Sequence, residues 1–401
     1  MRWLILLGTA TLFAGSPAYA QAKKVEKAEK TLAKAKAGKP GLYAKAWDML
    51  ADAKEDPETR DDAKTWVLLA ETAYQFVADP SLSSPVPEPW GVTWKAWDTA
   101  IGKGAGDQYA ERALEGLATM EATASNQATN AYEAGRVKEA WDELQRAMRC
   151  QQLIRQVGTL DPARELASLK LALVVATELG KLDEARELHE SLGKAGGART
   201  GTTLAVARAI EDGEGVEAAA TFLKPFAEAS PDDATLFETY AGWLLELKRD
   251  DDVRALLTKH ADQIGKAPAI TLVHAQTWAA LRDFPKATEA YEQALKVDGR
   301  NQDVLRGFAD LSLAVGRDYG KQAAEANAFK ERKSLRQKRD EALMKGMTLL
   351  QTSRELEPGH LPTLERLHEV YEEVELDDAE EIAALEQAID AAREKAAKEA
   401  K

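Results

Sequence analysis

The sequence contains few of the residues on which disulfide frameworks, aromatic cores and metal sites depend. Cys150 is the only cysteine in 401 residues, so no disulfide can form within the chain. Phenylalanine, tyrosine and tryptophan together make up 6% of the residues, and only five residues are histidine. Stability must therefore come from the packing of aliphatic and small side chains.

Long hydrophobic runs are confined to the start of the chain. Residues 1–20 combine Arg2, an apolar run and the small-residue exit Ala18-Tyr19-Ala20, a pattern typical of a secretory signal peptide cleaved between Ala20 and Gln21. The run is too short to span a bilayer, and no later stretch approaches membrane length. We therefore expect an exported protein without stable membrane insertion, located in a bacterial periplasm or secreted.

The charge balance is acidic. Aspartate and glutamate number 67 against 53 lysines and arginines, which gives a formal net charge of −14. Because a negative surface repels phosphate groups, this balance disfavours nucleic acid and anionic membranes as main partners.

The most regular feature of the chain is a pattern between Thr200 and Gly316 that returns every 34 residues. Small residues recur at this interval in two series. The first series is Ala207, Ala241, Ala275 and Ala309. The second series is Ala185, Ala219, Val253 and Ala287. Larger apolar residues lie around them at helical spacing, which indicates pairs of helices that cross at the small residues.

Helix-ending residues follow the same interval. They are Gly197, Pro231, Gly265 and Gly299. A 34-residue unit made of two helices resembles the tetratricopeptide repeat (TPR) family. The resemblance implies an all-α fold, a right-handed α-solenoid of antiparallel helix pairs, and we expect about eight pairs with insertions between them.

The N-terminal half repeats an Ala-Trp-Asp motif that begins at Ala46, Ala96 and Ala140. Each alanine falls where the second helix of a repeat needs a small residue, so we expect the same architecture there. The motif spacing exceeds 34 residues, and a proline-rich inserted loop at residues 80–91 accounts for part of the excess. The succession of these segments resembles a subset of exported bacterial TPR proteins.

These patterns predict four segments. They are a signal peptide at residues 1–20, irregular TPR-like helices at 21–160, a regular TPR array at 161–316 and a C-terminal part at 317–401. The C-terminal part is expected to contain a long basic helical segment, a last TPR-like pair and a capping helix.

The sequence shows no pattern that predicts catalysis, a cofactor site or a metal centre. No glycine-rich phosphate loop follows a strand. Cys150 lies in a helical run, where a small core residue is favoured over a reactive thiol. Glu365, His368 and Glu372 share one helical face, but a metal site in a helical bundle needs a second Glu-x-x-His pair, and the sequence has none. We therefore predict a protein that is not an enzyme.

A binding surface is then the expected functional feature. The resemblance implies that the first helices of the pairs line a concave groove that holds a peptide or helix of a partner. The side chains expected in this groove are Lys170, Arg208, Glu211, Glu238, Gln276, Arg306 and Asp310. Their mixed charges disfavour capture of a carboxylate tail by clustered cations.

Residues 330–339 (KERKSLRQKR) form the strongest basic cluster of the chain, with six basic residues and one acid. A solvated projecting helix is the simpler interpretation. The alternative is a docking site for an acidic partner, or for the chain's own acidic residues 372–381. The residues expected to dock are Lys333, Arg336, Lys338 and Arg339.

Our leading hypothesis is a periplasmic scaffold or adaptor that binds another envelope protein or peptide through its helical surface. The alternative is a carbohydrate- or peptidoglycan-associated module, because Trp90, Trp94 and Trp97 lie close together and exposed rings can stack on sugars. The sequence leaves the partner and the oligomeric state open.

Overall fold

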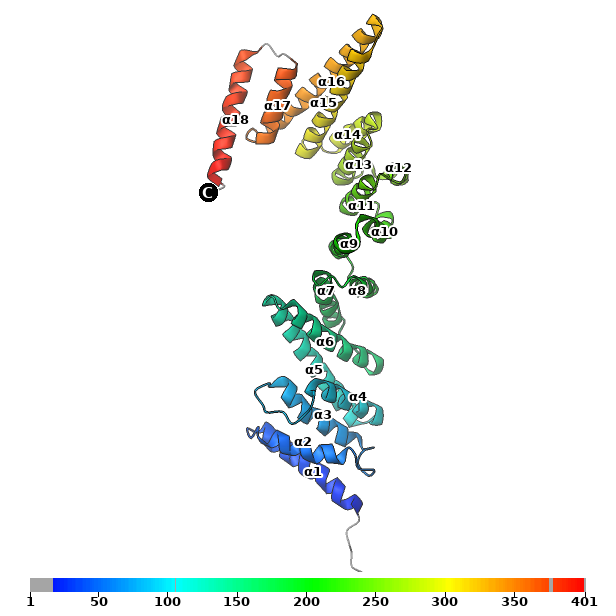
Figure 1. Ribbon diagram of the computed structural model, residues 1–401, viewed down its shortest axis with the longest axis vertical. Helices are drawn as coiled ribbons and strands as arrows, with labels where there is room; N and C mark the ends of the chain where they lie inside the picture. Colours follow the sequence, from blue (N-terminus) through cyan, green and yellow to red (C-terminus); the bar gives the residue numbers. More distant parts are fainter. Residues whose placement is uncertain (1–16, 105, 375–377, 400–401) are drawn as a thin grey trace, which may run out of the picture. The chain divides into compact units, whose positions relative to one another are not determined.

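A computed structural model describes residues 17–104, 106–374 and 378–399 (Figure 1). Within these ranges the chain forms eighteen α-helices and one short 3-10 helix, and it has no strand. Residues 1–16, which hold most of the predicted signal peptide, lie outside the described residues. The chain divides into two compact units, one ending at Ala198 and the other beginning at Arg199. The sequence boundaries expected at residues 160 and 316 stay predictions.

The first unit consists of four helix pairs. Their bounds are α1 (Pro17–Lys36), α2 (Leu42–Ala53), α3 (Ala63–Ala78), α4 (Pro89–Lys103), α5 (Gln108–Glu133), α6 (Val137–Val157), α7 (Pro162–Glu178) and α8 (Leu182–Lys194). Each helix packs on the next one in sequence. Ala46, Ala96 and Ala140 are buried on α2, α4 and α6, so the Ala-Trp-Asp motif belongs to the second helix of each of these pairs, as predicted.

The second unit continues the pairing. Its helices are α9 (Thr200–Glu214), α10 (Val216–Ala229), α11 (Ala234–Glu246), α12 (Asp250–Lys259), α13 (Pro268–Ala280), α14 (Phe284–Val297), α15 (Gln302–Glu325), α16 (Phe329–Leu356), α17 (Leu361–Glu373) and α18 (Ala379–Glu399), with the 3-10 helix at Ala261–Gln263. In the described ranges we find no helix that combines the length and apolarity needed to cross a bilayer.

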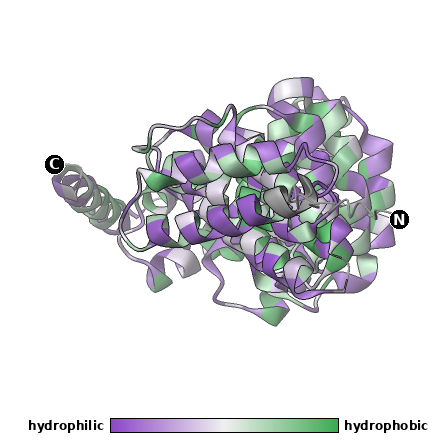
Figure 2. Ribbon diagram, turned by 90° about the horizontal axis from the view of Figure 1, so that it is seen from below, coloured by the Kyte–Doolittle hydropathy of each residue, from purple (hydrophilic) through white to green (hydrophobic). Residues whose placement is uncertain are grey.

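The small residues of both 34-residue series are buried as the repeat requires. All eight have 1% or less of their surface exposed. Hydrophobic and hydrophilic residues alternate along individual helices (Figure 2), which gives each helix one face for packing. The all-α helix-pair fold predicted from the sequence is confirmed, whereas its right-handed curl stays a prediction.

Side-chain caps and prolines set several helix starts. Asp62, Asp107, Asp161 and Asn301 each accept a hydrogen bond from a backbone N–H in the first turn of the helix that follows. α4 instead begins at Pro89, because proline is favoured in a first turn. The loop expected at residues 80–91 therefore ends at residue 88.

The longest helix pair is α15 with α16, of 24 and 28 residues. Two glycines let these helices approach closely. A Cβ atom at Gly316 would lie 2.8 Å from Leu343 Cδ2, and one at Gly346 would lie 2.8 Å from Leu313 Cδ2. Each glycine thus packs against a leucine of the opposite helix. These contacts hold α16 against α15, and the basic segment forms the N-terminal part of α16.

Candidate functional site

The residues expected to line a first-helix groove do lie on first helices. Lys170 is on α7 of the first unit, and the others are on α9, α11, α13 and α15 of the second. The exposed ones are Lys170, Arg208, Glu238, Gln276 and Asp310. Whether they bind a partner stays a prediction.

Three of these residues make contacts within the protein. Trp243 Nε1 on α11 donates a hydrogen bond to Glu211 Oε1 on α9 at 2.9 Å. Arg306 on α15 pairs with Glu357, the C-cap residue that follows α16. Such contacts join neighbouring helices, so these side chains contribute to the packing of the repeats.

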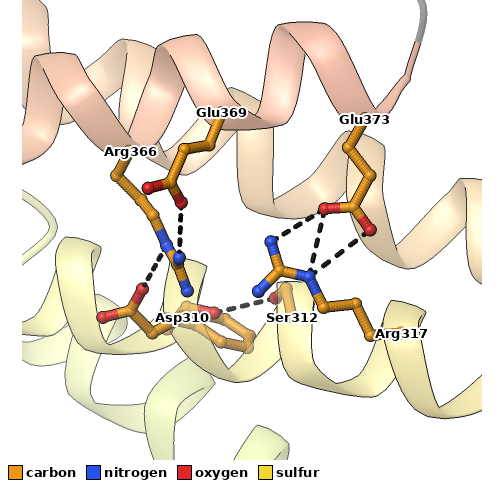
Figure 3. A network of polar contacts seen from close by, with 7 residues as sticks. Asp310, Ser312, Arg317, Arg366, Glu369 and Glu373 are labelled. Carbon is orange, nitrogen blue, oxygen red and sulfur yellow. Dashed lines mark hydrogen bonds and ion pairs between the residues drawn. The ribbon is translucent and has the colours of Figure 1, made fainter.

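Asp310 belongs to a network between α15 and α17 (Figure 3). Arg366 on α17 lies between two carboxylates, with Nε 3.2 Å from Asp310 Oδ1 and Nη1 2.7 Å from Glu369 Oε2. Beside it, Arg317 Nη2 donates to Glu373 Oε2 at 2.8 Å. The hydrogen bonds that Arg317 donates to the Glu373 carboxylate raise the pKa of Arg317. This ladder of ion pairs joins α17 to α15.

Two acids of the acidic stretch at residues 372–381 pair with arginines outside the basic segment. Glu373 pairs with Arg317, and Glu381 Oε1 accepts from Arg354 Nη1 at 2.6 Å. Neither arginine lies in residues 330–339. Where the structure describes this stretch, these two acids are therefore bound elsewhere.

The four predicted docking residues of the basic segment lie on α16. Lys333, Arg336 and Lys338 are exposed, whereas Arg339 is half-buried and lies 2.7 Å from the carboxylate of its neighbour Asp340. Lys338 Nζ lies 5.5 Å from the centre of the Tyr319 ring on α15. Binding by this segment stays a prediction.

Sequence reasoning missed a groove in the first unit. It lies between the second helices α6 and α8, over α7, and has a volume of about 650 Å³. Its apolar lining comes from Trp141 and Met148 on α6, Leu169 on α7 and Leu188 on α8. This size suits a side chain or a short segment of a bound chain.

A buried polar cluster fixes α6 beneath this groove. Gln151 Nε2 donates to Glu121 Oε1 on α5 at 2.7 Å and to Ser168 Oγ on α7 at 3.0 Å. All three residues are buried. Because buried polar groups are costly to leave unpaired, these bonds hold α6 in one position against α5 and α7.

A second groove of about 420 Å³ lies on the other side of α6, toward α4. Trp90 lines this groove, and the Arg146 guanidinium lies 5.7 Å from the centre of its ring. The Arg149 guanidinium, which also lines the groove, lies 4.2 Å from the centre of the ring of Trp94, which is on α4 like Trp90. Trp97 is buried. Guanidinium groups therefore occupy positions over the rings on which a sugar would stack.

Together the two grooves define what we call the α6 surface. It consists of Trp90, Trp94, Trp141, Gln145, Arg146, Met148, Arg149 and Gln152. Gln145 and Gln152 are exposed and line both grooves. One signal for this surface was present in the sequence, since Gln145, Arg149 and Gln152 follow Trp141 at helical spacing.

The surface offers binding groups rather than a reactive nucleophile. Cys150, on the opposite side of α6, is fully buried, which confirms the expectation of a core residue. Burial, with a smaller contribution from Glu121, raises the pKa of its thiol to about 12. A thiol with this pKa stays protonated near neutral pH and is a poor nucleophile.

The helical face considered as a metal site is divided among other partners. Glu365 Oε1 accepts from Arg393 Nη2 on α18 at 2.8 Å. His368 lies 3.8 Å from Glu372 and 3.6 Å from Glu386. Over the described residues, no group of three or more histidine, cysteine or carboxylate side chains could hold a metal ion.

Comparison with protein families gives one match. Residues 159–334 match the family model described as tetratricopeptide repeat. This segment contains the two alanine series, whose small residues are buried as the repeat requires. Over residues 159–334 the chain therefore matches the tetratricopeptide repeat family, as the sequence resemblance indicated.

Comparison with curated proteins gives no match. Among solved structures, a TPR repeats protein from Bacteroides fragilis has 18% identity and a TM-score of 0.35, with 62% of this chain and 97% of that chain covered. MamA has 13% identity and a TM-score of 0.32, with 48% and 96% covered. A human IFIT1 dimer with m7Gppp-AAAA has 13% identity and a TM-score of 0.35, with 86% and 72% covered. At these scores the similarities carry no argument about binding.

Proposed function

We propose that this protein is a non-enzymatic adaptor of the bacterial envelope that binds a protein partner through the α6 surface. The observation that carries the proposal is the pair of grooves beside α6. Tryptophan, methionine, arginine and glutamine side chains of α4 and α6 line them, and Glu165, Glu184, Glu187 and Lys194 form the charged rim of the first groove. Tryptophan, methionine and arginine are enriched at the centre of interfaces between proteins, and charged residues are common at the rim.

The chemistry of the α6 surface indicates what it binds. Trp141 and Met148 offer an apolar contact to a side chain of the partner. The free amides of Gln145 and Gln152 can both donate to and accept from a peptide backbone. Within the described part of the chain, Arg149 has no carboxylate partner, so it can pair with an acidic side chain. A peptide segment with one apolar anchor and one nearby acid fits these groups.

A crosslinking pull-down from the native envelope tests this proposal. The variant Gln145→Ala/Arg149→Ala/Gln152→Ala should lose proteins that the wild type captures, because it removes the polar groups of both grooves. The matched control, Arg208→Ala/Glu238→Ala/Gln276→Ala, changes three exposed residues of the first-helix face. Loss of partners from the control alone would move the binding site to the first-helix groove.

Each captured partner should then be titrated against purified wild type and both variants. A loss of about tenfold or more in affinity on removing the α6 groups would agree with a central binding site. Equal affinities for all three proteins would contradict the proposal. Unchanged helical circular dichroism of the variants shows that folding is intact.

We also propose export to the periplasm, on the basis of the signal-like pattern in residues 1–20. The N-terminus of the protein purified from cells should be Gln21 after cleavage. An uncleaved N-terminus, or recovery in the cytoplasmic fraction, would contradict this localisation.

The carbohydrate alternative receives less support, because Trp97 is buried and arginines lie over Trp90 and Trp94. It stays a prediction that sedimentation with purified peptidoglycan can test. Binding that depends on Trp90 and Trp94 would favour it over the protein-binding proposal.

A further inference from the structure

One face of α16 carries exposed side chains over its first four turns. Phe329, Lys333, Arg336, Asp340 and Met344 follow one another at intervals of three or four residues, so they lie along one stripe of the helix. Phe329 is 78% exposed and Met344 is 49% exposed. These two exposed apolar side chains mark the two ends of a charged stripe.

The charges of the stripe lie in two halves. Lys333 and Arg336 come first, and Asp340 and Glu341 follow. These residues, with Gln337 and Met344, line one shallow hollow along the helix. Over the described residues, neither Lys333 nor Arg336 has a carboxylate within ion-pair distance. Asp340 accepts from its neighbour Arg339, and Glu341 accepts from Gln337 at 2.9 Å.

This order of charges is complementary to itself when the helix is reversed. If a two-fold axis passes between Arg336 and Gln337, two antiparallel copies of α16 bring each residue opposite a fixed counterpart. Lys333 then faces Asp340 of the second copy, and Asp340 faces Lys333. Arg336 faces the amide of Gln337, and Phe329 faces Met344. Every charged or apolar residue of the stripe thus meets a suitable neighbour.

We propose that this stripe is a docking surface for a second copy of the chain, which pairs through antiparallel α16 helices. An anionic lipid or an acidic peptide fits less well, because Asp340 and Glu341 would lie against its negative charges. The interface consists of one helix face on each side and belongs with weak, reversible contacts rather than obligate ones.

Sedimentation equilibrium of the full-length protein over a range of concentrations tests the proposal. The wild type should show a reversible monomer–dimer equilibrium. Lys333→Glu places two pairs of like charges in the interface, and so does Asp340→Lys. Each should raise the dissociation constant about tenfold or more. The control Lys338→Glu makes the same charge change away from the stripe and should leave the constant unchanged.

Two complementation experiments distinguish self-pairing from another occupant. An equal mixture of the Lys333→Glu and Asp340→Lys proteins should form heterodimers, because each glutamate then faces a lysine and each remaining aspartate faces Lys333. The charge-swapped variant Lys333→Asp/Asp340→Lys should also recover the dimer. Restoration in neither experiment, or a wild type that stays monomeric at several hundred micromolar, would overturn the proposal. Binding of the wild type to phosphatidylglycerol vesicles without dimer formation would also overturn it and assign the stripe to lipid.

Discussion

At the residue scale, one position in the turn within a helix pair has a left-handed backbone conformation that side chains with a Cβ atom rarely adopt. Gly180, Lys248 and Arg282 occupy equivalent places in this turn and adopt left-handed conformations, with φ of 66°, 57° and 57°. Glycine adopts this conformation without a steric penalty, whereas residues with a Cβ pay about 1 kcal/mol. The turns at Lys248 and Arg282 therefore carry steric backbone strain, whereas the turn at Gly180 does not.

We predict that Lys248→Gly stabilises the second unit by about 0.5 to 1 kcal/mol, because it removes the steric strain of the left-handed backbone. The exposed Lys248 side chain contributes little that would be lost. Urea unfolding followed by circular dichroism measures the change. Lys248→Ala is the matched control, since it retains the Cβ atom and should bring no gain. Equal stabilisation by both substitutions would show that strain is not the cause.

A second residue-scale feature is a buried pair of histidines around Phe237. The ring centre of His274 lies 4.6 Å from that of Phe237 in a stacked arrangement, and that of His260 lies 5.9 Å away at an edge. Among the described residues, the ring nitrogens of both histidines have no hydrogen-bond partner. Burial, with a smaller contribution from His260, lowers the pKa of His274 to about 4. Burial and the positive charge of Lys259 lower the pKa of His260, and the smaller opposing contributions of Asp262 and Glu228 do not cancel this shift.

These shifts predict acid sensitivity of the second unit. The unfolded chain takes up a proton at His274 near pH 6.5, whereas the folded chain does so only near pH 4. Stability is therefore complete above about pH 6.5 and falls as the pH drops toward 4, by roughly 3 kcal/mol for His274. Urea unfolding between these pH values measures the loss. His274→Phe should flatten the profile, and an unchanged profile would contradict the assignment.

At the residue scale, the sequence predicted what depends on side-chain size and missed what depends on conformation. The alanine series and the core position of Cys150 followed from spacing, because close helix crossings admit only small residues. The left-handed turns at Lys248 and Arg282 did not, because lysine and arginine carry no signal for that conformation.

At the scale of single elements, the pair α15–α16 depends on the two glycines that face leucines. Gly346→Ala should destabilise the second unit by about 1 kcal/mol. The new Cβ would lie 2.8 Å from Leu313 Cδ2 and 3.2 Å from the carbonyl oxygen of Ala309. Overpacking of this kind costs about 1 to 3 kcal/mol, and the higher helix propensity of alanine offsets about 1 kcal/mol of it.

The control for this substitution is Gly242→Ala on α11. Gly242 is exposed and helical, and a Cβ there would meet no atom within 4 Å. This change should stabilise the protein by up to about 1 kcal/mol through propensity alone. Thermal unfolding of both variants separates the two effects. A gain at Gly346 as large as that at Gly242 would contradict the close packing.

The α6 surface shows why a helix can be predicted when its binding face cannot. The Ala-Trp-Asp motif that begins at Ala140 predicted that this segment forms the second helix of a pair and that Ala140 lies on its buried side. The two grooves depend on how far α4 and α8 lie from α6, and the side chains of several helices determine that distance. Short inserted segments before α4 and α7 alter the spacing without leaving a periodic pattern.

At the scale of the whole molecule, the division after Ala198 separates two bodies that each bury a core of their own. In the first, residues from Val25 to Ile154 form one hydrophobic cluster that includes Leu68 and Trp97. In the second, the cluster around Leu343 and Leu364 closes the C-terminal helices. In repeat proteins each repeat is stabilised mainly by its neighbours, so a cut between repeats removes little of either core.

We therefore predict that residues 21–198 and residues 199–401 each fold when expressed alone. Each fragment should give a helical circular dichroism spectrum and a cooperative thermal transition. The control fragment, residues 21–135, ends between α5 and α6 and exposes the apolar face of α5, including Leu117 and Met120, which are buried in the intact unit. It should unfold at a lower temperature than residues 21–198 or aggregate, because an exposed core face lacks the helix that covers it. If residues 21–198 and residues 199–401 both stay unfolded alone while the intact chain unfolds cooperatively, the division after Ala198 does not separate independent folding units.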